Sequence, residues 1–423
     1  MKTWRAAVVR TFGDPERIQI ENQTNLPQLT SPNQAKPLIP EHAYLQALIR
    51  VKCAGVNPVD TYIRSGHYSV LPHLPYTPGR EGSGIVEQVH SILMGRVEFG
   101  IEGRSIARTA ASKILKLYCF LDSRIKSSGY ADETPHAYIL VGEKAKNFQV
   151  GEKAKNFQVG DRVWFTDPLI GSCADYSIAD KFYKLNDETS FAEGATLGIK
   201  YMTAYRALFL KADAQAGQTV LIHGASGGVG LAACQLAFAS SLRVEFFTLC
   251  LKINYWDRTA EDRRYHKVIG TASTVDGRQL VKENGAEFVV DHSKGDYWEE
   301  LKEAYPSGFD VILEMLANAN LEHDFELVAN NGCIIVIGSR GTVEVNPRLL
   351  MVKEACVRGT LLAKSNANEY DLMSAQIGRL LNESAIRPVI SKRFPLRQLS
   401  VAHRYIIHHT GSQGSVVIDM DLG

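Results

Sequence analysis

The stretch that decides the fold is GQTVLIHGASGGVGLAACQLA, residues 217–237. Residues 219–222 form a short apolar run that predicts a β-strand, and the small apolar residues after the glycines predict a helix. Gly224, Gly227 and Gly230 occupy every third position of the turn between them. Glycine lets backbone N–H groups approach a diphosphate, and a helix N-terminus favours its negative charge. We therefore predict a dinucleotide phosphate site, against the alternative of a flexible glycine turn of an ordinary α/β protein. The predicted donors are the N–H groups of Ser226, Gly227, Gly228 and Val229.

Strand and helix patterns alternate downstream of this stretch. Apolar runs at 267–274, 287–291, 309–316 and 333–338 predict strands, with helical patterns between them. This alternation is typical of an α/β fold with a parallel sheet that is covered by helices on both faces. Residues 3–187 instead contain short strand patterns separated by Pro- and Gly-rich turns, which predict a β-rich domain.

Composition sets limits on function and location. The chain has 423 residues, 45% hydrophobic and 22% charged, with a formal net charge of +1. These values predict a globular protein of two to three domains, with no electrostatic argument for nucleic acid or membrane as partners. The seven cysteines include no C-x-x-C pair, which is typical of a reducing compartment. Because no signal-peptide core is present either, we expect a cytoplasmic protein.

Two segments interrupt these patterns. Residues 91–141 have weak periodicity, and GEKAKNFQV at 142–150 is repeated without change at 151–159. Residues 244–266 separate the helix of the glycine-rich unit from the next strand pattern. Structural repeats need longer periods and more copies, so the duplication indicates a gene-model artefact, with lineage-specific loops as the alternative. We predict that both segments are irregular surface excursions and that the second splits a strand of the sheet.

Several segments together resemble a known family, the zinc-free quinone oxidoreductases (zeta-crystallin family) of the medium-chain dehydrogenase/reductase superfamily. They occur in the family's order and cover about three quarters of the chain. This shared order is the context that makes the separate motif matches specific. The matching segments are GVNPVDTYIRSGHY, LPYTPG, GDRVW, YMTAYRALF, GASGGVGLAA, GTAST, NGAEFVVDH, EMLANANL, VIGSRGTVEVNPR and the tail from Arg387.

The resemblance implies three parts and an activity. A GroES-like β-rich catalytic domain would span residues 1–187, with an insertion at about 91–150. A Rossmann NADP-binding domain would span 188–357, with an insertion at about 244–267, and residues 358–423 would return to the catalytic domain. The implied activity is NADPH-dependent quinone reduction.

The resemblance also predicts that no metal is bound. Zinc dehydrogenases of the superfamily have a cysteine where Asn57 stands and a histidine where Arg80 stands. A catalytic zinc needs three protein ligands, and these two are lost.

The cofactor is predicted to be NADPH. The expected second strand ends at Gly270–Ser273 without the acidic residue that usually binds an NAD ribose, and Arg278 could bind a 2′-phosphate. The alternative uses Val244–Ile253 as the strand and Asp257 as the acid, which would favour NAD. Tyr62 and Asn57 are the catalytic candidates. The resemblance or the strand ends place further residues at the cofactor: Tyr62, Ser273, Arg278, His292, Asn320, Ile337, Gly338, Ser339, Arg340, Thr360, Leu361 and Leu362.

Other functions stay open at this point. An enone or alkenal reductase would use the same cofactor, and an RNA-binding or crystallin-type protein could retain NADPH binding. The resemblance implies AU-rich RNA as a partner, although no basic and aromatic cluster supports it independently. It also implies a homodimer or homotetramer, formed through edge strands near residues 333–347. No membrane partner is expected.

Overall fold

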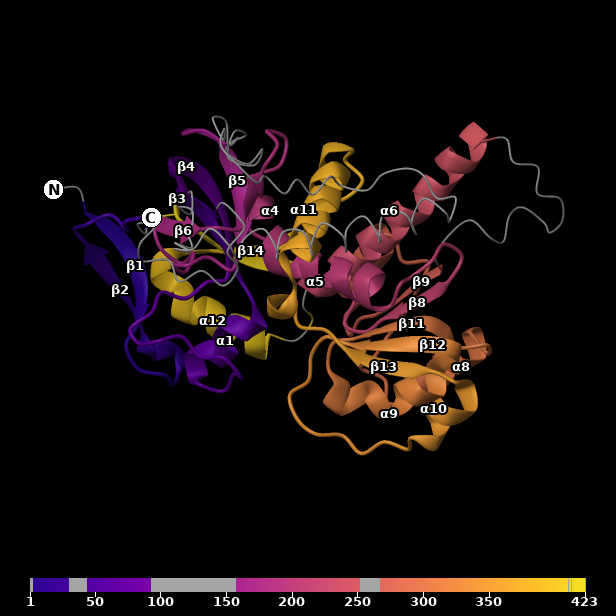
Figure 1. Cartoon of the computed structure of the whole chain (residues 1–423). Coiled ribbons are helices and arrows are strands. Elements are labelled where there is room, and N and C mark those ends of the chain that lie inside the picture. Colours follow the sequence, from indigo (N-terminus) through magenta and orange to yellow (C-terminus); the bar gives the residue numbers. More distant parts are fainter. Residues whose placement is uncertain are drawn as a thin grey trace, which may run out of the picture. The chain divides into compact units, whose positions relative to one another are not determined.

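The computed structural model in Figure 1 describes residues 3–29, 44–92, 157–251, 267–409, 411 and 413–422. Contacts group Met1–Ser31, Leu45–His90 and Phe157–Gly423 into one compact unit. Two main sheets organise this unit, and a two-stranded sheet stands beside them. None of the helices in the described ranges combines the length and the apolar character that crossing a bilayer would require.

The first sheet is parallel throughout and has six strands in the order β10-β9-β8-β11-β12-β13. Numbered along the chain, this is the order 3-2-1-4-5-6 of dinucleotide-binding folds. The sequence prediction of a Rossmann sheet is therefore confirmed. The strands are β8 (Thr219–Ile222), β9 (Lys267–Thr271), β10 (Phe288–Val290), β11 (Phe309–Glu314), β12 (Val328–Val336) and β13 (Cys356–Gly359).

Apolar side chains of alternate strand residues supply both cores of this sheet. Val220 and Ile222 enter one hydrophobic cluster, whereas Leu221 between them enters the cluster on the other face. Both faces are buried, which explains why the strands read as continuous apolar runs. The accompanying helices are α6 (Gly228–Leu251), α7 (Val275–Glu283), α8 (Tyr297–Ala304), α9 (Ala317–Leu327) and α10 (Arg348–Lys353).

Helix α6 corrects the prediction for the second unusual segment. It continues for 24 residues to Leu251, so residues 244–251 are helical and do not split a strand. The small and apolar residues from Gly228 onwards allow one continuous helix, and β9 begins only at Lys267. The alternative in which Val244–Ile253 formed the second strand, with Asp257 as an NAD-binding acid, is therefore wrong. Asp257 lies outside the described residues. So do residues 93–156, which include most of the first unusual segment and most of its repeat.

The second main sheet has seven strands and belongs to the β-rich domain. Its order is β14-β15-β3-β4-β5-β7, and β6 pairs with β3. Its interior is a separate hydrophobic cluster that includes Ile49, Val163 and Phe165. The strands are β3 (Tyr44–Val56), β4 (Glu81–Ile92), β5 (Arg162–Thr166), β6 (Tyr176–Ala179), β7 (Phe182–Lys184), β14 (Ile390–Pro395) and β15 (Ser415–Asp419), while β1 (Trp4–Val9) and β2 (Ile18–Gln23) form the small sheet.

Short helices complete the unit. A capping box of Ser190 and Glu193 is present at the start of α4 (Phe191–Gly194). The helical segment after it is divided into the π-helical turns η2 (Leu197–Tyr201) and η3 (Arg206–Lys211), with α5 (Met202–Tyr205) between them. The remaining helices are α1 (Pro58–Ser65), α11 (Ala367–Asn382), α12 (Leu399–His408), and the 3-10 turns η1 (Pro15–Arg17), η4 (Leu362–Lys364) and η5 (Leu396–Gln398).

Candidate active site

The glycine-rich turn joins β8 to the N-terminus of α6, as the sequence predicted. Gly224 has a φ of +56°, and a Cβ on Gly230 would lie 2.6 Å from the Cα of Ala225. Both positions therefore require glycine. The backbone N–H groups of Gly228 and Val229 belong to the first helical turn, where no intrahelical carbonyl can accept from them.

One predicted phosphate donor is already used inside the turn. The N–H of Gly227 donates to the carbonyl oxygen of Gly224 at 3.0 Å. The carbonyl of Ser226 accepts from Gly414 at 2.7 Å, which attaches the turn to the C-terminal segment. The N–H groups of Ser226, Gly228 and Val229 thus stay the candidates for binding phosphate, and Gly227 shapes the turn.

Three other predicted residues meet where β9 and β10 end. The Oγ1 of Thr271 lies 2.9 Å from Nδ1 of His292, and Arg278 donates to the carbonyl oxygen of Ser273 at 3.3 Å. Arg278 also forms an ion pair of 2.7 Å with Asp291. Hydrogen bonds from Ser293, joined by the charge of Arg278, hold the pKa of Asp291 below its usual value. Ser273, Arg278 and His292, three residues that the sequence analysis predicted to bind the cofactor, therefore lie together after β9 and β10.

Glu314, at the end of β11, organises a further group of predicted residues. Its Oε1 accepts from the N–H of Leu316 and from Nδ2 of Asn320, the latter at 3.1 Å. Its backbone carbonyl accepts from the N–H groups of Ile337 at 2.8 Å and Gly338 at 3.3 Å. One residue thus joins the turn after β11 to the turn after β12. Carboxyl ends of parallel strands are where open α/β sheets bind ligands.

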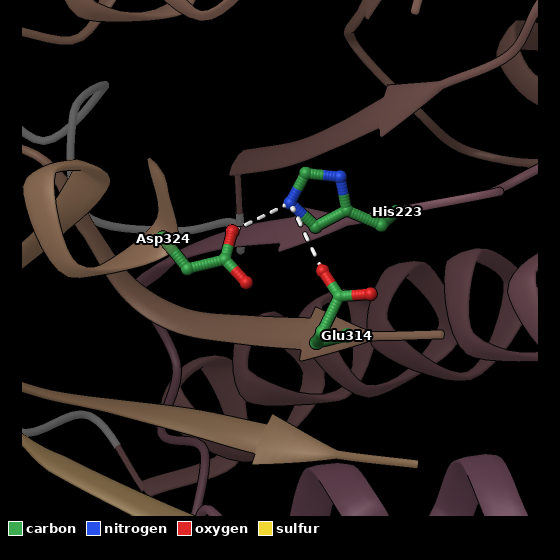
Figure 2. A group of neighbouring side chains, drawn as sticks. All are labelled: His223, Glu314 and Asp324. Atoms are coloured by element: carbon green, nitrogen blue, oxygen red, sulfur yellow. Dashed lines mark hydrogen bonds and ion pairs between the residues drawn. The ribbon is translucent and has the colours of Figure 1, made fainter. Parts of the chain in front are cut away.

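Glu314 is also part of a buried cluster with His223 and Asp324 (Figure 2). Nε2 of His223 lies 2.8 Å from Oδ1 of Asp324 and 3.7 Å from Oε2 of Glu314. All three side chains are buried. Burial opposes the charge on His223, yet the two carboxylates outweigh it and raise its pKa to about 9. Burial also raises the pKa of Glu314. The cluster thus joins the turn after β8 to β11 and to α9, the helix that carries Asn320.

Asn57, one of the two catalytic candidates, belongs to a second cluster around Glu81, the first residue of β4. Oε1 of Glu81 accepts from Nδ2 of Asn57 at 2.9 Å and from Nζ of Lys200, while its Oε2 accepts from the N–H of Ile199 at 2.7 Å. Glu81 and Lys200 are almost completely buried. The Lys200 stem packs at Gly228, where an added Cβ would lie 2.6 Å from its Cδ. The cluster therefore touches the start of α6.

Arg80 and Tyr62 have different partners. Nε of Arg80 donates to Asp167 at 2.8 Å, and Nε of Arg340 donates to the hydroxyl of Tyr62 at 3.3 Å. Two residues predicted from distant parts of the chain, Tyr62 and Arg340, are thus in contact. Arg340 is held in turn by its N–H, which donates to Asn318 at 2.7 Å.

The third strand end of this region carries Thr360. Its N–H donates to the carbonyl of Val336 at 3.0 Å, and its hydroxyl accepts from Arg206 at 3.0 Å. Leu361 next to it lines an open cavity of about 920 Å³, which is also lined by Asp60, Leu71 and Arg80. Leu362 is buried in the hydrophobic core, and Ser339 is exposed with its hydroxyl on the carbonyl of Gly341. The cavity offers space for a small apolar molecule.

Sequence reasoning missed Lys200, Glu314, Asp324 and His223 as organising residues. Lys200, His223 and Glu314 are titratable residues inside mainly apolar runs, such as Lys200 in ATLGIKYM and Glu314 in DVILEML, whereas Asp324 lies in the polar segment LEHDFEL. A polar residue at a buried position needs a partner, so this pattern was the available signal. It could not identify the partners, which come from other elements.

The sheet order and the glycine-rich turn define a Rossmann-type domain, which is joined to a β-rich domain in the same chain. Residues 44–107 match the family model described as alcohol dehydrogenase GroES-like domain, and residues 259–377 match the one described as zinc-binding dehydrogenase. The chain is 35% identical over 417 residues to a quinone oxidoreductase of Lama guanicoe, covering 98% of this chain and 97% of the relative. The human quinone oxidoreductase is 34% identical over 420 residues, covering 99% and 98%. The chain belongs to the quinone oxidoreductase family.

Solved structures agree on the fold. The Escherichia coli quinone oxidoreductase complexed with NADPH aligns with a TM-score of 0.66 at 22% identity, covering 98% of this chain and 99% of that one. The human synaptic vesicle membrane protein VAT-1 homolog-like protein aligns with a TM-score of 0.67 at 21% identity, covering both chains completely. Two proteins with different names thus share this architecture, so the fold alone does not define the reaction.

Proposed function

We propose that this protein is an NADPH-dependent quinone reductase that works without zinc. The observation that carries the proposal is the glycine-rich turn between β8 and α6, at the point where the order of the parallel sheet reverses, in a chain about 35% identical to quinone oxidoreductases. NADPH would supply the hydride, and the protein would bind, orient and shield the reactants.

The cofactor contacts proposed follow the strand ends. The N–H groups of Ser226, Gly228 and Val229 would bind the diphosphate. Ser273, Arg278 and His292 would hold the adenosine end. The turns that Glu314 joins, with Asn320, Ile337 and Gly338, would hold the nicotinamide end, together with Tyr62, Arg340 and the segment Thr360–Leu362.

The preference for NADPH rests on charge. In the described part of the chain, β9 ends at Thr271 and is followed by Ala272 and Ser273, so no carboxylate occupies the position that binds an NAD ribose. The carboxylate of Asp291 after β10 is neutralised by Arg278 at 2.7 Å. A 2′-phosphate would meet the guanidinium of Arg278, which can bind it with paired hydrogen bonds.

Zinc independence rests on what the former ligand positions do. Asn57 donates its amide hydrogen to Glu81, Arg80 is a permanent cation paired with Asp167, and both oxygens of Glu81 already accept hydrogen bonds. Zinc needs ligands with free lone pairs. The ammonium of Lys200 provides the positive charge against Glu81 instead.

A quinone suits this site because its carbonyl oxygens can accept the electrons without a Lewis acid. The cavity beside Arg80 and Leu361 is the proposed place for the ring. Asn57 would affect this reaction indirectly, through the hydrogen bond that it donates to Glu81. Tyr62 would orient the reactants by hydrogen bonding or stacking.

The test is NADPH oxidation by the purified protein with 9,10-phenanthrenequinone or 1,4-benzoquinone, compared with a cyclic enone and an alkenal. We expect turnover of the quinones, unchanged by 1,10-phenanthroline, and a higher KM for NADPH but not for NADH in Arg278→Ala. Tight NADPH binding without quinone turnover refutes the reductase, and enone turnover alone identifies the alternative activity. Loss of activity with the chelator refutes zinc independence.

The oligomer stays a prediction. We propose a homodimer or homotetramer formed through the edge of the nucleotide-binding sheet. The sequence analysis expected this edge near residues 333–347, but β12 (Val328–Val336) lies between β11 and β13, so the edge strand is β13 (Cys356–Gly359). Light scattering on the full chain tests it, and a monomer at micromolar concentration contradicts it.

A further inference from the structure

Two cysteines face each other across the last two strands of the parallel sheet. Cys333 of β12 and Cys356 of β13 are register partners, and their Sγ atoms lie 3.1 Å apart. Both are free thiols. A hydrogen bond between the two thiols would contribute little stability, because thiols are weak donors and weak acceptors.

The backbone already satisfies the geometry of a disulfide. Directly adjacent strands of a sheet are about 4.8 Å apart, which falls inside the range of about 4.4–6.8 Å between the Cα atoms of bonded cysteines. The two side chains share one face of the sheet because they occupy paired positions. Closing the Sγ atoms to a bond length of about 2.05 Å requires a movement of about 1 Å, which side-chain rotation can supply.

The two sulfurs differ in accessibility. Cys333 is 7% exposed, and burial raises the pKa of its thiol to about 12. The side chain of Cys356 lies on the same face of the sheet as that of Cys333 and is partly exposed there. An oxidant can therefore reach Cys356 from this face without using the edge of β13, whereas the buried Cys333 is placed to react with its neighbour.

We propose that Cys333 and Cys356 are a modification site, at which a peroxide converts the two thiols into an intramolecular disulfide. In the first step, the sulfur of Cys356 takes one oxygen from hydrogen peroxide to form a sulfenic acid, and water leaves. In the second, the sulfur of Cys333 attacks that sulfenic sulfur, the S–S bond forms and a second water leaves. The two thiols lose two hydrogens and two electrons, and both peroxide oxygens end as water.

The bond has a defined structural consequence. It would close a ring containing the segment between β12 and β13, which includes Ile337–Arg340 and helix α10. It would also attach the edge strand β13, only four residues long, to its neighbour. Such a bond in a reducing compartment would be transient and responsive to oxidants. The proposal does not depend on the quinone reductase activity.

The experiment treats the full chain with hydrogen peroxide and maps its peptides by mass spectrometry without reduction. We expect one peptide pair linked through Cys333 and Cys356, lighter by two hydrogens and separated by dithiothreitol. Amide hydrogen exchange across β13 should slow in the oxidised form. The link should disappear in Cys333→Ser and Cys356→Ser and persist in Cys234→Ala, whose cysteine is buried in α6.

The order of the steps is tested in the same variants. In Cys333→Ser, dimedone should label Cys356, because its sulfenic acid has lost the thiol that resolves it. A folded, peroxide-treated chain without the 333–356 link overturns the proposal. So does a product in which Cys356 pairs with a second molecule instead.

Discussion

The buried pair of Lys200 and Glu81 yields the strongest quantitative prediction. The side chain of Lys200 is 5% exposed and that of Glu81 is 0% exposed, so water cannot replace either partner. The variant Lys200→Met keeps an unbranched stem of similar volume and removes only the charge. Glu81 would then have two remaining donors, Asn57 and the N–H of Ile199, and no cation.

The expected loss is about 3–5 kcal/mol in the free energy of unfolding, the cost of leaving one member of a buried ion pair alone. The matched control is Lys302→Met, whose lysine pairs with Glu326 at the surface with side-chain exposures of 34% and 42%. That substitution should cost about 0–1 kcal/mol. The double variant Lys200→Met, Glu81→Gln removes both charges and should be more stable than Lys200→Met alone.

Urea unfolding measures these differences, followed by circular dichroism and by tryptophan fluorescence, to which Trp164 in the adjoining core contributes. Two results would refute the reasoning. One is a loss for Lys200→Met no larger than that of the surface control. The other is a double variant no more stable than Lys200→Met, because the penalty would then not come from the unpaired Glu81 carboxylate.

Three further predictions concern the turn, a helix and the buried histidine. Gly230→Ala should weaken NADPH binding about 10–100-fold, because its Cβ would displace the backbone of Ala225 and misalign charge-assisted donors; Gly295→Ala, which meets nothing within 4 Å, is the control, and equal dissociation constants would contradict this. Gly378→Ala, inside α11 with open space around it, should stabilise the protein by about 0.5–1 kcal/mol in thermal or urea unfolding; a lower midpoint would contradict it. Because the folded pKa of His223 is raised to about 9, its stabilising effect is complete below an unfolded pKa of about 6.5 and is lost as pH rises through 9. The free energy of unfolding measured in urea should therefore fall across this pH range, by up to about 3 kcal/mol from this residue, and Asp324→Asn should make the fall smaller. An equally steep fall in that variant would exclude this cause.

Local patterns were sufficient for most of the nucleotide-binding sheet. Strands β8 to β12 were predicted because each is an apolar run buried on both faces. Strand β13 and helix α10 were missed. Residues 356–359 have the sequence CVRG, which is not an apolar run. They lie at the edge of the described sheet, where β12 is the neighbouring strand, and none of them is fully buried. The segment 244–251 was misjudged because its strand-like composition is overridden by continuation of α6.

By itself, the sequence determined where the glycine-rich turn lies and which residues follow each strand, because glycine spacing and apolar period are local properties. The family resemblance added that Asn57 and Arg80 stand where zinc dehydrogenases have a cysteine and a histidine. Only the tertiary structure decided which residues meet. It joined Asn57 and Lys200 at Glu81, placed His223 between Asp324 and Glu314, used the N–H of Gly227 inside its own turn, and brought the sulfurs of Cys333 and Cys356 within 3.1 Å. The physical reason is that buried charge and close sulfur contact depend on partners from distant segments, and strand order, which no local pattern contains, selects those partners.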